Sequence, residues 1–318
     1  MTEDFDVDPV DKALALWGLQ NASARFVAGR ENRVYRVEDA SGTYALRLRR
    51  PGYRGADELA SELHWLFAMA DAGLNVPEPQ KSLTGALMEP LGERHVDLLE
   101  WLSGKPLGQS RDPLELDDSV ATFRDLGRMM AKLHNACDAW QRPSWFKRCH
   151  WNLDGFLGEA PLWGRFWENS TLDVETRTLL VEFREKATAD LAAVQEGLDY
   201  GLVHGDLVRE NVMVDGDQLS MIDFDDGGFG FRLFDVATAL IKNLGEPNFP
   251  DLQAALIGGY REYRPLDDRH LPLFMGLRAV TYVGWIVPRM EEEGSPARNI
   301  RFINTARDLC GAYLNKTA

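Results

Sequence analysis

The chain has 318 residues, 45% of them hydrophobic and 27% charged, and this length predicts two lobes rather than one simple core. Its formal net charge of −15 argues against nucleic acid and anionic membranes as partners, because both repel an acidic surface. No run of eighteen apolar residues and no basic start before an apolar segment occurs, so we expect neither a membrane span nor a secretory signal, and the three scattered cysteines favour a cytoplasmic location.

The first hundred residues predict a small sheet with one helix. Residues 33–39 and 43–50 both alternate between apolar and polar side chains, and the turn residues 40–42 between them indicate a hairpin. Period-two alternation places Arg47 and Arg49 on one face of the second strand. Residues 56–74 predict a helix that stops at Gly73, and two more strands are expected at 85–90 ("GALMEP") and 95–102 ("HVDLLEWL").

After residue 104 the sequence becomes mostly helical. Apolar residues recur at helical spacing over 123–137, a second long helix is expected over 172–197, and helical patterns dominate from about 235 to 315. The chain therefore predicts a small lobe that contains a sheet, a connector near 100–105, and a larger, mostly helical lobe.

Two short polar stretches interrupt the apolar pattern of the larger lobe. "HGDLVREN" occupies 204–211, and "DFDD" begins twelve residues later, at 223. The intervening "NVMVDGDQLSMIDF" predicts strand, turn and strand. Such a hairpin would hold Asn211 at the start of one strand and Asp223 at the end of the other, with Asp206 in the loop just before it.

These three side chains suit one kind of chemistry. Two carboxylates and an amide oxygen are hard ligands that favour Mg²⁺ over zinc, and Mg²⁺ completes its shell with water and phosphate oxygens. A carboxylate that stays off the metal can deprotonate a hydroxyl. In kinase-type phosphoryl transfer a catalytic Asp precedes an Asn by five residues, as Asp206 precedes Asn211 here.

These motifs resemble those of the aminoglycoside phosphotransferase and choline kinase superfamily, including its homoserine-kinase-like branch. The resemblance implies that Asp206 is the catalytic base and that Asn211 and Asp223 hold Mg²⁺, while Asp235 in "FDVA" buttresses the loop. It also implies a two-lobed, protein-kinase-like α+β fold, in which a small antiparallel-sheet lobe is joined to a larger, mostly helical lobe. Residues 1–100 would then form a nucleotide-binding lobe, and residues 101–318 a catalytic and acceptor-binding lobe.

The same resemblance assigns ATP to the first lobe. "AGRENRVYRVED" at 28–39, with Gly29 and Asn32, is similar to the loop that covers the phosphates. "LEWLSG" at 99–104 is similar to the hinge that contacts adenine, through backbone atoms near Glu100 and Leu102.

Arg47 stands where the family usually carries a lysine that pairs with phosphate. An arginine is a permanent cation whose planar fork suits phosphate, and Glu62 on the predicted helix is its expected partner, with Glu58 one turn earlier as a competitor. The alternative is that Arg47 is an ordinary surface residue of the strand.

Other residues near these motifs have structural interpretations. We interpret His204 as a residue that hydrogen-bonds the loop rather than a proton carrier, and Asp226 as part of a turn. Tryptophans between hinge and loop either pack or line an acceptor pocket, and packing is favoured; they are Trp145, Trp151, Trp163 and Trp167.

The expected activity is transfer of the γ-phosphate of ATP to a hydroxyl of a small molecule. A Ser/Thr protein kinase is the first alternative, but only about ten residues separate "DFDD" from "FDVA", which leaves no room for an activation loop. A nucleotide-binding pseudokinase is the second, and Arg47 in place of lysine motivates it. Oligomeric state and ATP-versus-GTP preference stay open.

The acceptor is expected to be cationic: an amino alcohol, an amino acid or an aminoglycoside. The acids of the predicted loop favour a positive group, and "RMEEEG" at 289–294, beside Tyr282 and Trp285, could hold an ammonium through charge and cation–π contact. The alternative for this acidic stretch is a solvated turn.

Overall fold

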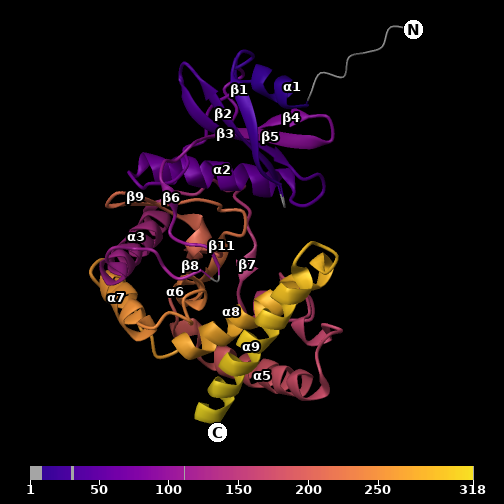
Figure 1. Cartoon of the computed structure of the whole chain (residues 1–318), viewed down its shortest axis with the longest axis vertical. Coiled ribbons are helices and arrows are strands. Elements are labelled where there is room, and N and C mark those ends of the chain that lie inside the picture. Colours follow the sequence, from indigo (N-terminus) through magenta and orange to yellow (C-terminus); the bar gives the residue numbers. More distant parts are fainter. Residues whose placement is uncertain (1–8, 30–31, 111, 318) are drawn as a thin grey trace. The chain divides into compact units, whose positions relative to one another are not determined.

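The computed structural model describes residues 9–29, 32–110 and 112–317, with the side chain of residue 317 excepted (Figure 1). The chain forms two compact units. Unit 1 comprises residues up to Lys105 together with 140–148 and 213–222, and unit 2 comprises the remainder. Each unit is therefore built from segments that are separated in the sequence.

Unit 1 is built on a five-stranded antiparallel sheet with the order β1-β2-β3-β5-β4. Its strands are β1 (Ser23–Gly29), β2 (Asn32–Asp39), β3 (Gly42–Arg49), β4 (Glu89–Leu91) and β5 (Arg94–Glu100). The predicted hairpin is confirmed as β2 and β3, and the register of β3 with β5 sets Arg47 opposite Asp97. That register brings opposite charges together on one face of the sheet.

One side of this sheet carries the apolar core of unit 1. Helix α1 (Pro9–Ala15) contributes Val10 and Leu14, which cluster with Leu46 and Leu48 of β3. These two leucines are almost fully buried, as the alternation predicted. The face that carries Arg47 and Arg49 is thereby left for polar interactions.

Helix α2 (Ala56–Asp71) confirms the predicted helix over 56–74. It begins after Gly55, whose N–H donates to Glu58 Oε2 at 3.1 Å, and it ends at Asp71, followed by the C-cap Ala72 and by Gly73, which has a φ of 80°. Gly73 needs this left-handed conformation to terminate the helix.

The strand predicted over 85–90 is largely wrong, because β4 begins only at Glu89. Gly85 has a φ of 87° and donates its N–H to the carbonyl of Ser82 at 2.9 Å, and Ser82 N–H donates to the carbonyl of Ala86 at 2.8 Å. These residues therefore form a tight turn in place of the predicted strand.

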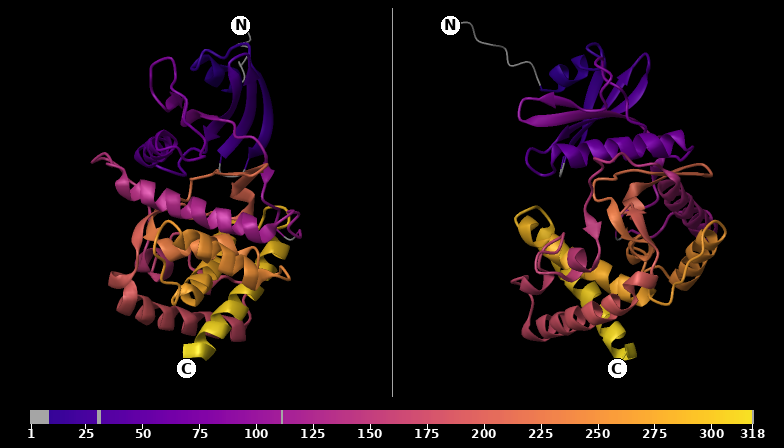
Figure 2. Two further views of the ribbon diagram at one scale, coloured as in Figure 1. Left: turned by 90° about the vertical axis from the view of Figure 1, so that its left-hand side faces the viewer. Right: turned by 180° about the vertical axis from the view of Figure 1, so that it is seen from behind.

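Unit 2 is mostly helical, and Figure 2 shows α5, α8 and α9 packed side by side. Its helices are α3 (Ser119–Ala139), α4 (Leu153–Leu157), α5 (Val174–Val194), α6 (Arg232–Ile241), α7 (Phe249–Arg261), α8 (Leu271–Trp285) and α9 (Ser295–Thr317), with 3₁₀ turns η1 (Phe166–Glu168), η2 (Gln195–Gly197), η3 (Arg209–Asn211) and η4 (Val287–Arg289). The long helices over 123–137 and 172–197 are confirmed as α3 and α5.

Two small sheets surround the polar motifs. They have the orders β10-β9-β6 and β7-β11-β8 and consist of β6 (Lys105–Pro106), β7 (His150–Trp151), β8 (Tyr200–Val203), β9 (Val212–Asp215), β10 (Gln218–Met221) and β11 (Gly228–Phe231). The predicted strand, turn and strand after Asn211 is confirmed as β9 and β10.

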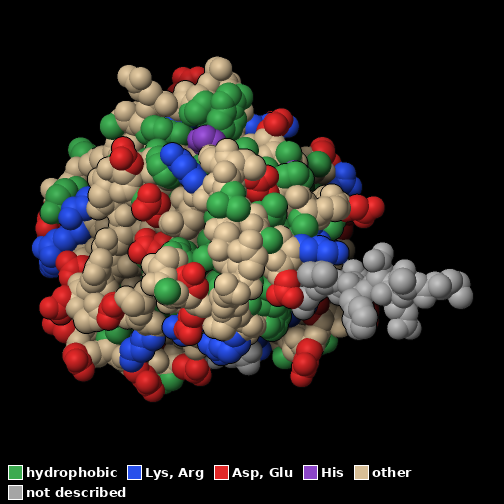
Figure 3. Space-filling model, turned by 90° about the horizontal axis from the view of Figure 1, so that it is seen from above, with side chains coloured by type: hydrophobic (Ala, Val, Ile, Leu, Met, Phe, Trp, Pro, Cys, Tyr) green, Lys and Arg blue, Asp and Glu red, His purple; other side chains and the backbone are tan. Residues whose placement is uncertain are grey.

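Among the described residues, one helical stretch is long and apolar enough to span a membrane by length and composition. It is Leu271–Arg289, and 78% of its most apolar window is buried inside the fold. This burial is what a core helix of unit 2 requires. On the face shown in Figure 3, acidic and basic side chains are interspersed.

Candidate active site

The polar loop after β8 is held by its own backbone. Gly205 has a φ of 79°, and a Cβ at this position would collide with the carbonyl of Asp226, so the turn requires glycine. The carbonyl of Asp206 accepts from Val208 N–H at 2.8 Å, and Asn211 N–H donates to the carbonyl of Val208 at 2.9 Å. These bonds place Asp206 and Asn211 at opposite ends of one tight turn.

Asp235 anchors this loop from helix α6. Its buried carboxylate accepts the backbone N–H groups of His204 at 2.7 Å and Gly205 at 2.8 Å, and lies 3.0 Å from His134 Nε2. Burial alone would raise the pKa of Asp235, but the contact with His134 and the other hydrogen bonds hold this pKa below its usual value. Asp235 therefore remains a carboxylate that fixes the start of the loop.

His204 has a structural environment. Its ring is buried, lies 4.4 Å from the Phe224 ring, and accepts the N–H of Asp206 at Nδ1 over 3.3 Å. These contacts agree with the interpretation that His204 orders the loop. Asp226 lies in a turn closed by Gly227 N–H and the carbonyl of Phe224 at 3.0 Å, as expected.

Asp206 and Asn211 are in direct contact. Asn211 Nδ2 donates to the backbone carbonyl of Asp206 at 2.8 Å and to its Oδ2 at 3.1 Å. The other carboxylate oxygen of Asp206 accepts from Arg278 of helix α8. Burial raises the pKa of Asp206 to about 6, although Arg278 opposes this rise. A carboxyl group poised in this range can accept a proton near neutral pH.

Asn211 and Asp223 present oxygen atoms that suit a hard divalent cation. Asn211 uses its Nδ2 to hold Asp206, which leaves Oδ1 without a described hydrogen bond, and the exposed Asp223 adopts a φ of 66° directly after the hairpin. A left-handed conformation is uncommon for a residue other than glycine and often marks a functional site. Within the described residues no group of three His, Cys, Asp or Glu side chains forms a metal cage. Two protein ligands fit Mg²⁺, which keeps waters and phosphate oxygens in its shell.

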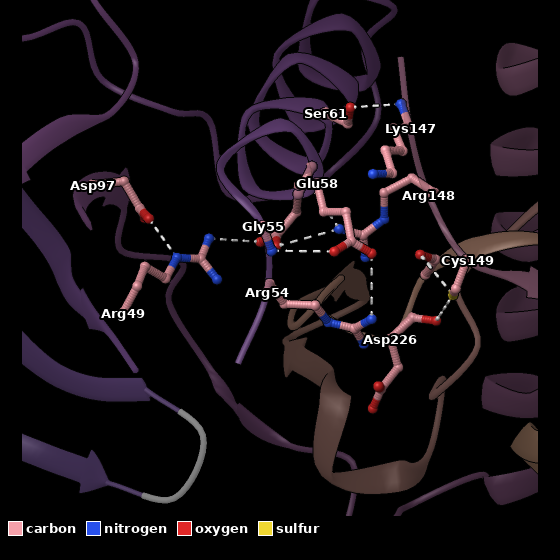
Figure 4. Close-up of polar contacts among 12 residues, drawn as sticks. Arg49, Arg54, Gly55, Glu58, Ser61, Asp97, Lys147, Arg148, Cys149 and Asp226 are labelled. Atoms are coloured by element: carbon pink, nitrogen blue, oxygen red, sulfur yellow. Dashed lines mark hydrogen bonds and ion pairs between the residues drawn. The ribbon is translucent and has the colours of Figure 1, made fainter. Parts of the chain in front are cut away.

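Unit 1 contains a buried cluster of opposite charges, which we call the arginine cluster: Arg47, Arg49, Glu62, Asp97 and Arg148. Arg47 donates through Nε to Asp97 at 2.6 Å and through Nη1 to Glu62 Oε1 at 2.8 Å. Arg49 reaches the same two acids, at 2.6 Å and 3.0 Å, and Figure 4 shows its contact with Asp97. Arg47 is only 7% exposed, so the alternative that it is a surface residue is wrong.

The predicted pairing of Arg47 with Glu62 is present, and Glu58 takes another role. Glu58 caps the first turn of α2, while its backbone carbonyl accepts from Arg148 Nη1 at 3.1 Å (Figure 4). Arg148 also lies 3.8 Å from Glu62 Oε2. We missed Arg49, Asp97 and Arg148 as members of this cluster. The signal for Arg49 was its place two residues from Arg47 on the same face of β3.

The remaining residues assigned to ATP lie at or just beyond the ends of strands of the first sheet. Gly29 ends β1 and Asn32 begins β2, and residues 30–31 of the predicted phosphate loop lie outside the described residues. The N–H of Glu100 already donates to the carbonyl of Glu78 at 2.8 Å, so only its carbonyl could meet adenine. Leu102 follows β5 and is half-buried.

Aromatic rings near the polar loop after β8 face cations of the chain itself. The guanidinium carbon of Arg278 lies 4.6 Å from the centre of the Trp163 ring and 4.2 Å from that of Tyr282, and Lys242 Nζ lies 4.5 Å from the latter. Arg289 lies 4.3 Å from the Trp285 ring. The rings to which we assigned an acceptor ammonium thus already have cationic partners. Residues 291–293 form an exposed acidic turn.

The tryptophans between residues 145 and 167 mostly pack within their own units. Trp151 is 1% exposed and contacts the rings of Phe156 and Phe234, and Trp145 meets His64 edge to face. Packing was the favoured interpretation, and Trp163 departs from it through its contact with Arg278.

Residues 23–270, most of the chain, match the model of the phosphotransferase enzyme family (APH). The chain belongs to this family. The predicted resemblance is confirmed, and the chain is a small-molecule kinase, a phosphotransferase with an alcohol group as acceptor.

Relatives of known activity share this family. Amicoumacin kinase of Bacillus subtilis (strain 168) is 29% identical over 291 residues, which cover 86% of this chain and 82% of that protein. Homoserine kinase of Methylobacillus glycogenes is 24% identical over 273 residues, covering 83% and 78%. Both are named as kinases of small molecules, which agrees with a small-molecule acceptor for this phosphotransferase rather than a protein.

Solved structures confirm the fold. A microcompartment-associated aminopropanol kinase superposes with a TM-score of 0.84 and 29% identity, over 98% of both chains. Amicoumacin kinase hAmiN, solved with AMP-PNP, Ca²⁺ and Ami, gives 0.75 at 21% identity, over 94% of this chain and 92% of that one. The predicted protein-kinase-like α+β fold of this phosphotransferase is thereby confirmed.

Proposed function

We propose that this phosphotransferase moves the γ-phosphate of Mg²⁺–ATP to the hydroxyl of a small molecule, with Asp206 as the base. The observation that carries this proposal is the pairing of Asp206 with Asn211 on a loop fixed by Asp235. The acceptor oxygen forms a bond to the γ-phosphorus, the bond to the β–γ bridging oxygen breaks, and ADP leaves. The hydroxyl proton passes to Asp206. Positioning and electrostatics supply most of the rate in such transfers.

Asn211 and Asp223 would hold the metal. The amide oxygen of Asn211 and the carboxylate of Asp223 are the hard ligands that Mg²⁺ prefers. When bound, Mg²⁺ neutralises charge on the phosphate oxygens. The left-handed backbone of Asp223 supports a functional role, because this residue accepts an unfavourable conformation.

Unit 1 would supply the nucleotide contacts of a domain that spans residues 1–100, and residues 101–318 would supply catalysis and the acceptor site. The arginine cluster supports this division, because it places buried guanidinium groups, next to Glu62 and Asp97, in the unit that contains the large sheet. Guanidinium groups are donors that suit phosphate oxygens. Arg47 would steady the phosphates, Gly29 and Asn32 would flank the covering loop, and the Glu100 carbonyl and Leu102 would contact adenine.

The acceptor classes follow from the family and from the relatives. We propose an amino alcohol, an amino acid or an aminoglycoside, since relatives are named for aminopropanol and homoserine. A cytoplasmic location is proposed with it, because ATP and such metabolites are available there. Nucleic acid and membranes are not proposed as partners, given the net charge of −15.

The test is whether ADP release depends on an acceptor. Purified enzyme with Mg²⁺ and ATP is incubated with pools of amino alcohols, hydroxy amino acids and aminoglycosides, and phosphorylated products are identified by mass spectrometry. We expect ADP release to rise with one class and a phosphate ester to form in equal amount. Equal ADP release with and without every pool, despite nucleotide binding, would support the pseudokinase instead.

A further inference from the structure

Arg278 places a buried guanidinium against the catalytic carboxylate. It is fully buried on α8 and uses Nη2 to donate to Asp206 and, at 2.8 Å, to the hydroxyl of Tyr282. Its Nε and Nη1 have no hydrogen-bond partner among the described residues. A buried donor without an acceptor costs roughly 1–3 kcal/mol, and more when it is charged. An acceptor oxygen placed beside Nε or Nη1 would remove this cost.

Lys242 brings a second cation to the same place. It directly follows α6, and its ammonium lies 4.5 Å from the Tyr282 ring centre and 5.3 Å from that of Phe302. Among the described residues, no carboxylate lies within 4.0 Å of this ammonium, and none forms a hydrogen bond with it. Burial lowers the pKa of Lys242, while Glu210 and Asp206 oppose this effect and Arg278 and Arg301 add to it.

Glu210, an acid near Lys242, forms no ion pair with it. Glu210 instead accepts the backbone N–H of Ser110 at 2.7 Å and the Ser110 hydroxyl. Its Oε2 is buried and has no hydrogen-bond partner in the part of the chain that the structure describes. Asp206 is committed to Asn211 and Arg278. Lys242 and the remaining donors of Arg278 thus form a set of cationic donors beside the base.

An acceptor hydroxyl that gives its proton to Asp206 must lie within hydrogen-bond reach of that carboxylate. The carbons next to the hydroxyl are then a few bonds from Arg278, because Arg278 contacts the same carboxylate. An ammonium at this position would meet two cations on the Tyr282 ring and would be repelled. A carboxylate would instead accept hydrogen bonds from both.

We propose that the acceptor carries a carboxylate close to its hydroxyl, and that Lys242 and Arg278 bind this carboxylate. The proposal rests on the proposed function and narrows its acceptor to a hydroxy amino acid, the member of the proposed classes that carries a carboxylate. Specificity then comes from charge-assisted hydrogen bonds, which are roughly twice as strong as neutral ones.

Two matched pairs of acceptors isolate the carboxylate. Threonine differs from 1-amino-2-propanol only by a carboxylate, and homoserine differs from 3-amino-1-propanol in the same way. We expect kcat/KM of the parent enzyme to be about 10- to 100-fold higher for the carboxylate member of at least one pair, as one charged hydrogen bond provides. A preference for the amino alcohol in both pairs would overturn the proposal.

Lys242→Met tests the residue itself. Methionine keeps the length and apolar contacts of the side chain on the two rings but has no charge. We expect kcat/KM to fall about 10- to 100-fold for the carboxylate member and by a clearly smaller factor for the amino alcohol, which lacks the group that Lys242 binds. Lys242→Arg should retain the preference, because it keeps a cation. Lys132→Met is the matched control, since Lys132 is an exposed lysine 4.7 Å from the Tyr263 ring centre.

An equal loss for both members of a pair in Lys242→Met would contradict the role of Lys242 and leave the kinase activity established. If the variant does not fold, as judged by circular dichroism and nucleotide binding, the substrate pairs with the parent enzyme decide alone. If the parent enzyme phosphorylates no acceptor at all, the proposed function fails, and the carboxylate proposal fails with it.

Discussion

At the scale of residues, Arg47, which stands where the family usually carries a lysine, forms ion pairs with its buried neighbours. A lysine offers one ammonium, whereas Arg47 reaches two acids that come from different elements, Glu62 of α2 and Asp97 of β5. Arg49 contacts the same acids. The planar fork of arginine suits such a shared arrangement, because each nitrogen keeps a fixed direction.

We expect Arg47→Ala to impair both nucleotide use and stability. The change removes a buried cation from two carboxylates, although Arg49 still pairs with both, so the free energy of unfolding should fall by about 1–3 kcal/mol. Arg47→Lys keeps the charge but loses one of the two contacts, so it should retain more activity. KM for ATP and thermal melting measure the two effects. A KM for Arg47→Ala equal to that of the parent would mean that another group anchors the phosphates.

The two proposed metal ligands should contribute unequally to the affinity for Mg²⁺–nucleotide. Asp223→Ala removes a charged oxygen ligand and Asn211→Ala a neutral one, so the first should weaken Mg²⁺–nucleotide binding more strongly. Loss of partners around metal ligands already lowers affinity about 10- to 100-fold, and loss of the charged ligand should reach at least that range. Calorimetric titration with and without Mg²⁺ measures the effect. Unchanged Mg²⁺-dependent binding in Asp223→Ala would remove Asp223 from the site.

At the scale of elements, helix α3 contacts Asp235, which anchors the polar loop after β8, through one buried histidine. His134 lies 3.0 Å from Asp235 at Nε2 and 2.7 Å from the Tyr260 hydroxyl at Nδ1. Burial, helped by the charge of Arg232, lowers the pKa of His134 to about 4. A neutral His134 donates to Asp235 and accepts from Tyr260, so one proton arrangement satisfies three groups.

This histidine predicts a pH dependence of stability. Because its folded pKa of about 4 lies below the unfolded value of 6.5, the unfolded state takes up the proton first, and stability falls as pH drops below about 6.5. The full loss, complete below the folded pKa, is on the order of 3 kcal/mol. Urea unfolding between about pH 7 and pH 5 leaves most carboxylates ionised, and Asp206, with its pKa of about 6, contributes alike to the parent and to a His134 variant. His134→Gln should show a flatter profile in this window, and an equal slope in both proteins would contradict the assignment.

Helices α3 and α7 meet through glycines. A Cβ on Gly127 would overlap the carbonyl oxygen of Leu256, and a Cβ on Gly259 would overlap that of Arg124. Two helices can approach this closely only where side chains are absent. The packing of α3 therefore depends on residues that the apolar spacing does not reveal.

Gly127→Ala should destabilise the enzyme by about 1–3 kcal/mol, as overpacking of a tight core does. Its effect should exceed the small helix-propensity gain of alanine over glycine, roughly 1 kcal/mol. Gly197→Ala is the control, since no atom lies within 4 Å of its added Cβ. Thermal melting of both variants gives the comparison, and a Gly127→Ala variant as stable as the control would contradict the close approach.

At the scale of the whole molecule, local pattern predicted most elements and the polar loop. Alternation gave β2 and β3, helical spacing gave α3 and α5, and the residues between Asp206 and Asp223 gave the hairpin. These features depend on neighbours in sequence. The turn at Ser82–Ala86 was not predicted, because hydrogen bonds and not apolar periodicity determine it.

The environment of Asp206, the proposed base, could not be predicted in the same way. Arg278 lies 72 residues after Asp206, and Lys242 follows another helix, so their approach depends on how helices pack. The sequence around an arginine in an apolar helix does not indicate which residue that arginine will contact. The expectation of an acceptor ammonium at Tyr282 was drawn from nearby acids, whereas the ring faces Arg278 and Lys242.

The central claim is that Asp206 takes the proton of the acceptor hydroxyl, and Asp206→Asn tests it most directly. Asparagine keeps an oxygen for Arg278 but cannot act as the base. Steady-state kinetics with a phosphorylated acceptor, paired with calorimetric binding of Mg²⁺–ATP, should show kcat reduced about 10²–10⁴-fold while nucleotide affinity is unchanged. Asp217→Asn, an exposed residue of the β9–β10 turn, should behave as the parent. An Asp206→Asn enzyme that turns over like the parent would contradict the account.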